Sequence, residues 1–147
     1  MSLRPSFATL ATGILVLAAQ APGQAQLARV RADLTPLVES ETVAAGNDLR
    51  VALRIRLPEG YHVNSNKPRD ELLIPIELVV VPPSGVSVSE LVYPTPTDLK
   101  QRGAEQPLSV FEREFTIGVA MNVAAGAAVG DLTIPAKLHY QACDETM

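Results

Sequence analysis

Apolar and polar side chains alternate along much of the chain with a period of two residues. In the clearest example, residues 50–57, four aliphatic side chains fall on one face and three arginines on the other. Successive side chains of a β-strand point to opposite faces, so this segment is predicted to be a half-buried strand with a solvated arginine face. The aliphatic residues are Val51, Leu53, Ile55 and Leu57, and the arginines are Arg50, Arg54 and Arg56.

Four further segments are predicted to be strands. Residues 72–81 are mostly apolar but contain Pro75, which has no N–H to donate, so an edge strand or a bulge is expected there. Residues 86–93, 109–122 and 132–143 show the same alternation. The predicted inward face of 109–122, interrupted by Arg113, consists of Phe111, Phe115, Ile117, Val119 and Met121.

Segments of turn-forming or small residues separate these strands. Residues 61–68 and 123–130 are predicted to be turns. Residues 94–107 look irregular, with three prolines, one glycine and several charges. A loop of that length is uncommon in a small domain and often functional, although a plain surface excursion explains it equally well.

Six or so short strands and no convincing helix predict an all-β antiparallel sandwich or barrel. An immunoglobulin-like β-sandwich usually contains about seven strands. Because the sequence ends just after the last predicted strand, we expect an immunoglobulin-like antiparallel β-sandwich that lacks its closing C-terminal strand.

The first 25 residues have the organisation of a secretory signal peptide. Arg4 precedes an apolar run at 7–19, and Gly23-Gln24-Ala25 provides the pattern of small residues that a signal peptidase accepts. The run is shorter than the roughly 20 apolar residues that a membrane-spanning helix needs. We therefore expect cleavage after Ala25, export, and a domain formed by residues 26–147 that does not insert into the membrane.

The charge of the chain bears on its possible partners. There are 12 basic and 16 acidic side chains, and loss of Arg4 with the signal peptide would leave a net charge of −5. The charges are scattered rather than clustered, so nothing favours nucleic acid or anionic lipid as a partner. The remaining 122 residues suffice for one domain with a hydrophobic core.

The chain contains one cysteine, Cys143. Disulfides persist outside the cytoplasm, so an unpaired thiol in an exported protein is buried, paired with another chain or chemically active. Strand alternation puts Cys143 on the polar face with His139 and Gln141, whereas a structural cysteine belongs among apolar side chains. The pattern therefore predicts an exposed, usable thiol.

Several neighbours bear on the reactivity of that thiol. His139 lies four residues before Cys143, about 13 Å away in an extended strand, so it is too far to act as a base. His62 could approach only through the tertiary fold. Asp144 and Glu145 disfavour the thiolate. These scattered histidines and one cysteine, without a closely spaced ligand pair, argue against a metal site, and no phosphate-binding or other cofactor motif is present.

Two stretches together resemble a known family. Residues 57–68, Leu-Pro-Glu-Gly-Tyr-His-Val-Asn-Ser-Asn-Lys-Pro, resemble the P-x-G-Y/W-H-x-N-S-x-x-P segment of the N-terminal domains of the DsbD family of thiol:disulfide interchange proteins. The segment Tyr140-Gln141-Ala142-Cys143 resembles the Y-Q-A/G-C motif that opens their redox pair. The resemblance spans residues 29–147.

The resemblance implies an immunoglobulin-like periplasmic domain with Cys143 as its catalytic thiol and no cofactor. Such domains receive electrons from a membrane-embedded donor domain and a thioredoxin-like domain. They pass them to periplasmic thioredoxin-fold proteins, including those of cytochrome c biogenesis. The loop after Tyr93 would lie where the family has a cap over its active site. The family's second cysteine does not occur before Met147, so we expect a truncated form with impaired turnover.

A second class of function stays open on the sequence. An exported immunoglobulin-like module could bind a protein partner through an edge strand or the 94–107 loop without redox activity, and Cys143 would then be incidental. Replacement of Cys143 by serine separates the two hypotheses, because it would abolish covalent capture of a partner and leave non-covalent binding intact.

Overall fold

The computed structural model describes residues 30–101, 103 and 105–144, which form ten β-strands and no helix. Sequence alternation predicted only six or so strands. The strand at 33–38 was not predicted, those at 61–64 and 97–99 lie in a predicted turn and a predicted irregular loop, and two predicted strands are each broken in two. The strands are β1 Asp33–Val38, β2 Asp48–Arg56, β3 Tyr61–Asn64, β4 Glu77–Val80, β5 Val86–Val92, β6 Thr97–Leu99, β7 Leu108–Glu112, β8 Glu114–Val123, β9 Ala136–His139 and β10 Ala142–Asp144.

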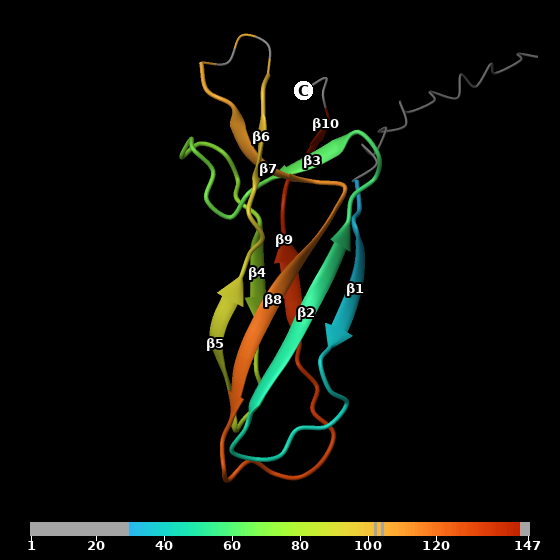
Figure 1. Cartoon of the computed structure of the whole chain (residues 1–147), viewed down its shortest axis with the longest axis vertical. Helices are drawn as coiled ribbons and strands as arrows, with labels where there is room; N and C mark the ends of the chain where they lie inside the picture. Colours follow the sequence, from blue (N-terminus) through green and yellow to red (C-terminus); the bar gives the residue numbers. More distant parts are fainter. Residues whose placement is uncertain (1–29, 102, 104, 145–147) are drawn as a thin grey trace, which may run out of the picture.

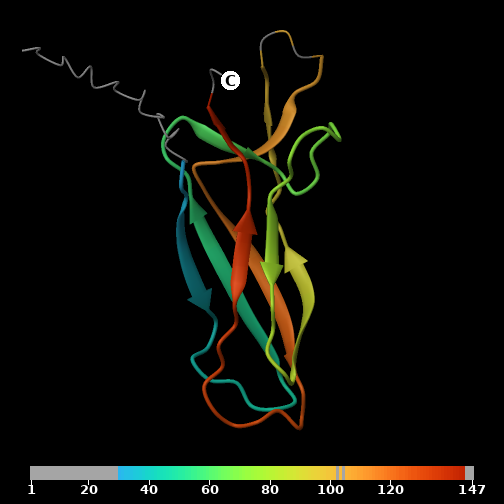
Figure 2. The same ribbon diagram turned by 180° about the vertical axis from the view of Figure 1, so that it is seen from behind.

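These strands form three antiparallel sheets, in the orders β1-β2-β8-β5, β10-β3-β7-β6 and β4-β9. The first sheet makes one layer of the molecule and the β4-β9 pair lies across from it, as the front and back views show (Figure 1, Figure 2). The sheet β10-β3-β7-β6 lies at one end of these two layers (Figure 1). The predicted fold class is confirmed: the chain is all-β and antiparallel, consistent with an immunoglobulin-like β-sandwich.

The hydrophobic core lies between the layers and is centred on β2 and β8. Along both strands buried and exposed side chains alternate as predicted, with Ile55 and Ile117 fully buried. Arg54 and Arg56 lie on the exposed face, where Arg56 forms a 2.8 Å ion pair with Glu114. The buried core residues are Leu49, Ile55, Leu57, Val63, Ile76, Leu78, Phe111, Phe115, Ile117, Val119, Met121 and Val123.

The prediction of a turn over residues 61–68 is wrong at its start, because Tyr61–Asn64 form β3. This short strand pairs with β7 on one side and β10 on the other. Backbone pairing on both sides outweighs the turn preference of Asn64, whose side-chain amide donates to the Ile74 carbonyl oxygen at 3.1 Å.

The other boundaries follow the predictions in part. The prediction of an irregular loop at 94–107 is wrong at residues 97–99, where β6 pairs with β7. The predicted strand at 132–143 is interrupted at residues 140–141, between β9 and β10. The predicted strand at 72–81 begins only after Pro75, and β4 lies at a sheet edge, as Pro75 indicated.

The predicted strand at 109–122 is also broken, at Arg113, and this break creates a corner. The β2–β8 ladder ends at the pair Arg56–Glu114, and the β3–β7 ladder begins at the pair His62–Glu112. Residues 57–61 on one side are therefore opposed by Arg113 alone on the other. We call residues 57–61 together with Arg113 the corner.

The backbone of the corner is tightly held. The amide N–H of Leu57 donates to the carbonyl oxygen of Arg113 at 2.6 Å, and that of Tyr61 donates to Pro58 at 3.2 Å. Gly60 has a φ of 78° and Arg113 a φ of 55°, both in the left-handed region. The unequal lengths of the two sides turn the paired strands out of the first sheet and into the sheet β10-β3-β7-β6.

Residues 1–25, predicted to be a signal peptide, lie outside the described residues. In the part of the chain that the structure describes, no helix is long and apolar enough to cross a bilayer.

Substitution Gly60→Ala is expected to destabilise the protein. Its φ of 78° costs an L-residue roughly 1–2 kcal/mol. An added methyl group would meet no atom within 4 Å, so the loss would come from backbone strain alone. The free energy of unfolding, measured by urea denaturation followed by circular dichroism, checks this.

Gly126→Ala is the matched control. Its added methyl group also meets nothing within 4 Å, but its φ lies outside the left-handed region. We expect its stability to be unchanged or slightly higher. Equal losses in the two variants would contradict the role assigned to Gly60.

Candidate functional site

Cys143 lies in β10, an edge strand of the sheet β10-β3-β7-β6, and is half-buried. Its neighbour Ala142 is paired with Val63 and packs against the core. Because successive strand residues point to opposite faces, Cys143 points away from the core. Strand alternation predicted that Cys143 lies on the polar face, and this placement agrees with it. The residue is less exposed than predicted.

Tyr140 anchors the segment that leads into β10. Its hydroxyl accepts a hydrogen bond from the amide of Ala32 at 2.8 Å and donates one to the carbonyl oxygen of Val30 at 3.4 Å. Together with the β10–β3 ladder, these contacts fix the position of Cys143 relative to the rest of the sheet.

His62 stands directly opposite Cys143. The two residues are partners in the β10–β3 ladder, and His62 is in turn the partner of Glu112 in the β3–β7 ladder. Side chains of directly opposed residues in antiparallel strands share a face, with Cβ atoms about 4.5–5.5 Å apart. The sheet therefore sets a thiol, an imidazole and a carboxylate in one row across three strands.

A cleft of about 540 Å³ lies on the Glu112 side of this row. The corner and its flanking residues form it, with Leu99 contributed by β6. His62 and Glu112 line the cleft, although His62 is only 3% exposed in total. The imidazole thus stands between the thiol on β10 and the cleft.

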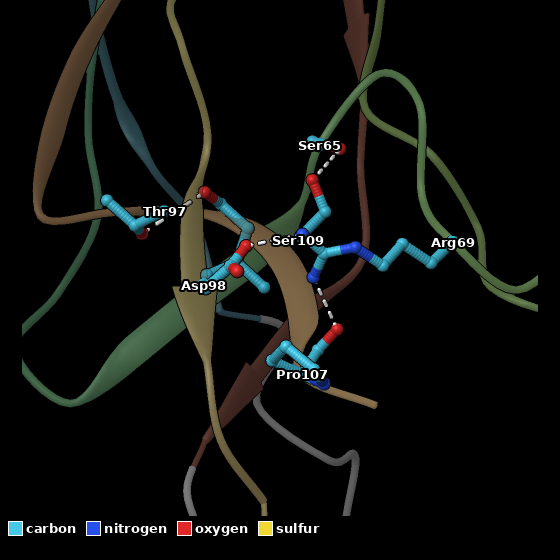
Figure 3. Close-up of polar contacts among 7 residues, drawn as sticks. Ser65, Arg69, Thr97, Asp98, Pro107 and Ser109 are labelled. Atoms are coloured by element: carbon cyan, nitrogen blue, oxygen red, sulfur yellow. Dashed lines mark hydrogen bonds and ion pairs between the residues drawn. The ribbon is translucent and has the colours of Figure 1, made fainter. Parts of the chain in front are cut away.

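The β6–β7 hairpin is fastened to the loop after β3 by polar contacts (Figure 3). The amide of Ser65 donates to the Ser109 carbonyl oxygen at 2.8 Å, and the two buried hydroxyls are 2.9 Å apart. Arg69 donates to the Pro107 carbonyl oxygen and to Asp98, both at 2.6 Å. These contacts hold the hairpin beside the cleft.

The surroundings of Cys143 favour its protonated form. Desolvation by burial raises the pKa of the Cys143 thiol, and the adjacent carboxylate of Asp144 raises it further. The predicted effect of Asp144 is thus confirmed, while Glu145 lies outside the described residues. Because the thiolate is the nucleophile, this cysteine needs either a raised pH or a nearby proton acceptor to react.

His139 and Glu112 do not join a metal site. His139 is exposed at the end of β9, opposite Glu77, and belongs to a different sheet from Cys143. One carboxylate oxygen of Glu112 accepts a hydrogen bond from the Thr97 hydroxyl at 3.1 Å. Among the described residues, no group of three or more His, Cys, Asp or Glu side chains is arranged to hold a metal ion.

A family profile described as "Thiol:disulfide interchange protein DsbD, N-terminal" matches residues 33–147. This range includes β3, the corner and Cys143. The chain belongs to the DsbD N-terminal domain family. No curated protein and no solved structure matches it. Membership of this family makes it a thiol:disulfide interchange domain. Domains of this family are in general periplasmic and have thioredoxin-like redox partners.

Sequence reasoning on this DsbD domain found Cys143 but gave His62 no role. The two residues are 81 positions apart, and their proximity depends on the register of β3 against β10. The only signal in the sequence was that His62 lies in the 57–68 segment that carries the resemblance to the DsbD family.

The alkylation of Cys143 by iodoacetamide is expected to rise with pH through a midpoint above that of an unperturbed thiol, because burial and Asp144 raise its pKa. In Asp144→Asn the carboxylate charge that disfavours the thiolate is gone, so the midpoint should move to lower pH and the rate at neutral pH should increase. Stopped-time alkylation followed by mass spectrometry measures both.

Asp131→Asn is the control for total charge. Asp131 is exposed in the β8–β9 connection, which lies at the opposite end of the molecule from β10 (Figure 1). The pH midpoint of Cys143 alkylation in Asp131→Asn should equal that of the unmodified protein. An Asp144→Asn midpoint at or above the unmodified value would show that the carboxylate does not act on the thiol.

Proposed function

We propose that this DsbD N-terminal domain exchanges disulfides with periplasmic thioredoxin-fold proteins through Cys143. The observation that carries the proposal is the placement of a half-buried thiol on an edge strand, in a chain that belongs to a thiol:disulfide interchange family. Because β10 has β3 on one side only in the described sheet, a partner can approach the thiol along the open side.

The exchange step forms one S–S bond and breaks another. The Cys143 sulfur, as a thiolate, attacks one sulfur of the partner's disulfide. A new S–S bond forms between Cys143 and the partner, and the partner's own S–S bond breaks. The second partner sulfur leaves as a thiolate and takes up a proton. The product is a mixed disulfide, and completion of the two-electron reduction needs one more thiol.

The sequence supplies no second cysteine for that completion. We propose that a polypeptide of these 147 residues forms the mixed disulfide but turns over poorly on its own. A thiol from another molecule would then resolve the bond, and the electrons would come from a membrane donor domain. Export by cleavage after Ala25 remains part of the same proposal.

The competing hypothesis is a binding module in which Cys143 has no chemical role. Membership of the DsbD N-terminal family favours thiol exchange over this hypothesis. We further propose that the β6–β7 hairpin limits access to the site, because it is fastened beside the cleft by Arg69 and the Ser65–Ser109 pair.

The reduced protein is expected to form a covalent complex with a thioredoxin-fold partner. The partner should be a periplasmic disulfide isomerase or cytochrome c maturation thioredoxin with one cysteine, activated as a mixed disulfide with thionitrobenzoate. Attack by Cys143 should release the coloured thiolate and give a complex on a non-reducing gel that dithiothreitol dissolves.

Cys143→Ser should give neither the colour nor the complex. Activated glutathione serves as a control without a protein surface and should react more slowly than the activated partner. If Cys143 is shown to be reduced and alkylatable, yet reacts no faster with the partner than with glutathione, the proposed recognition of thioredoxin-fold proteins is wrong.

A further inference from the structure

The exchange step described above leaves one buried ionisable group unused. His62 is 3% exposed and lies between β10 and β7. Within the described part of the chain, its imidazole makes no hydrogen bond or ion pair. Every fully shielded side-chain nitrogen or oxygen among the described residues has a hydrogen-bond partner, so the imidazole nitrogens retain some contact with solvent, and the placement of a proton-exchanging ring there needs a physical explanation.

The position of His62 relative to the thiol suggests that explanation. Its ladder partner on one side is Cys143 and on the other is Glu112. Opposed side chains share a face at a Cβ separation of about 4.5–5.5 Å, which brings an imidazole within reach of a sulfur. His62 also lines the cleft, whereas Cys143 stands on the far side of His62 from Glu112. A proton leaving the thiol toward the cleft therefore meets the imidazole first.

We propose that His62 relays the proton of the Cys143 thiol during exchange, an inference that rests on the proposed function. As the sulfur becomes nucleophilic, its S–H bond breaks and the proton moves to an imidazole nitrogen. When the partner's sulfur leaves as a thiolate, the imidazolium gives the proton to that sulfur. The histidine gains and loses one proton and no electrons, so the sulfur chemistry of the exchange step is unchanged.

The thiol itself requires such an acceptor. Burial and Asp144 raise the pKa of Cys143, so at neutral pH the thiol seldom ionises unaided. Imidazole is the side chain best suited to exchange protons near neutral pH. A transient imidazolium at His62 would have the Glu112 carboxylate opposite it on the neighbouring strand β7.

Other ionisable groups lie near His62 in the sheet and along the cleft. On its own strand and the preceding turn lie Tyr61 and Glu59, and the cleft wall carries charges of both signs. The ionisable neighbours in full are Cys143 and Asp144 on β10, Glu112 on β7, Tyr61 and Glu59 beside His62, and Arg56, Arg113 and Glu114 on the cleft wall.

The test compares pH–rate profiles for the reaction of Cys143 with iodoacetamide and with a small aromatic disulfide. In the unmodified protein the rate at pH 7 should already exceed what the ionised thiol alone provides, because the imidazole accepts the thiol proton, and it should rise further at higher pH as the thiol ionises. In His62→Gln the rate should rise only when the thiol ionises unaided, at higher pH. At pH 7 we expect the variant to be slower by about 10-fold or more. Well above the thiol midpoint, the two profiles should converge.

His139→Gln is the matched control, because it removes an exposed histidine from β9 and leaves the row of Cys143 and His62 intact. Its profile should superimpose on that of the unmodified protein. Added imidazole should restore part of the lost rate in His62→Gln. A purely structural role for His62 would lower the rate by a similar factor at every pH and would not be rescued. A His62→Gln profile that matches the unmodified one would overturn the proposal.

A second measurement uses the unmodified protein and does not depend on a variant that folds. Conversion of Cys143 to its methyl disulfide should shift the imidazole resonances of His62 in NMR spectra, while those of His139 stay in place. Unchanged His62 resonances would also overturn the proposal.

The two proposals fail in different ways. Both measurements use small reagents, so they test His62 without a protein partner. If no partner is trapped but the pH–rate profiles of the unmodified protein and His62→Gln differ as expected, only the proposed function is refuted. Efficient trapping of the partner, together with a pH–rate profile that His62→Gln leaves unchanged, would refute only the proton relay.

Discussion

The corner between two strand ladders determines where every element of the candidate site lies. β2 and β8 pair along the core, and the same two stretches of chain pair again as β3 and β7 after the corner. The hydrogen bond from the Leu57 amide to the Arg113 carbonyl oxygen joins the two sides of the corner where the ladder is interrupted. Gly60 and Arg113 adopt the left-handed conformations that the change of direction needs.

The corner has two consequences for chemistry. It carries β3 to the end of the sandwich, where β10 pairs with its free side and Cys143 comes to face His62. It also opens the cleft, because residues of the corner form much of the cleft wall. One local irregularity in an otherwise regular ladder thus places the thiol, sets a histidine beside it and opens a path toward solvent.

Sequence alternation predicted β2, β5 and β8, the apolar face around Ile117 and the class of fold, because these depend on local periodicity. It did not predict β1, and it did not predict β3 or β6, since these two are short and are held by pairing with β7 rather than by their own residues. The parity of Cys143 could be read locally. Its contact with His62 could not, because the register of two strands 81 positions apart is fixed by the fold as a whole.

The central claim is that β10 and β3 pair in the register that opposes Cys143 to His62. Opposed residues have Cα atoms about 4.5–5.5 Å apart, within the range of about 4.4–6.8 Å that a disulfide spans. The most direct measurement is therefore the count of free thiols in His62→Cys after mild oxidation, with Val63→Cys, whose side chain faces the core, as the comparison. The structure predicts no free thiol in monomeric His62→Cys and two in Val63→Cys. Two free thiols in His62→Cys would contradict the register and the site built on it.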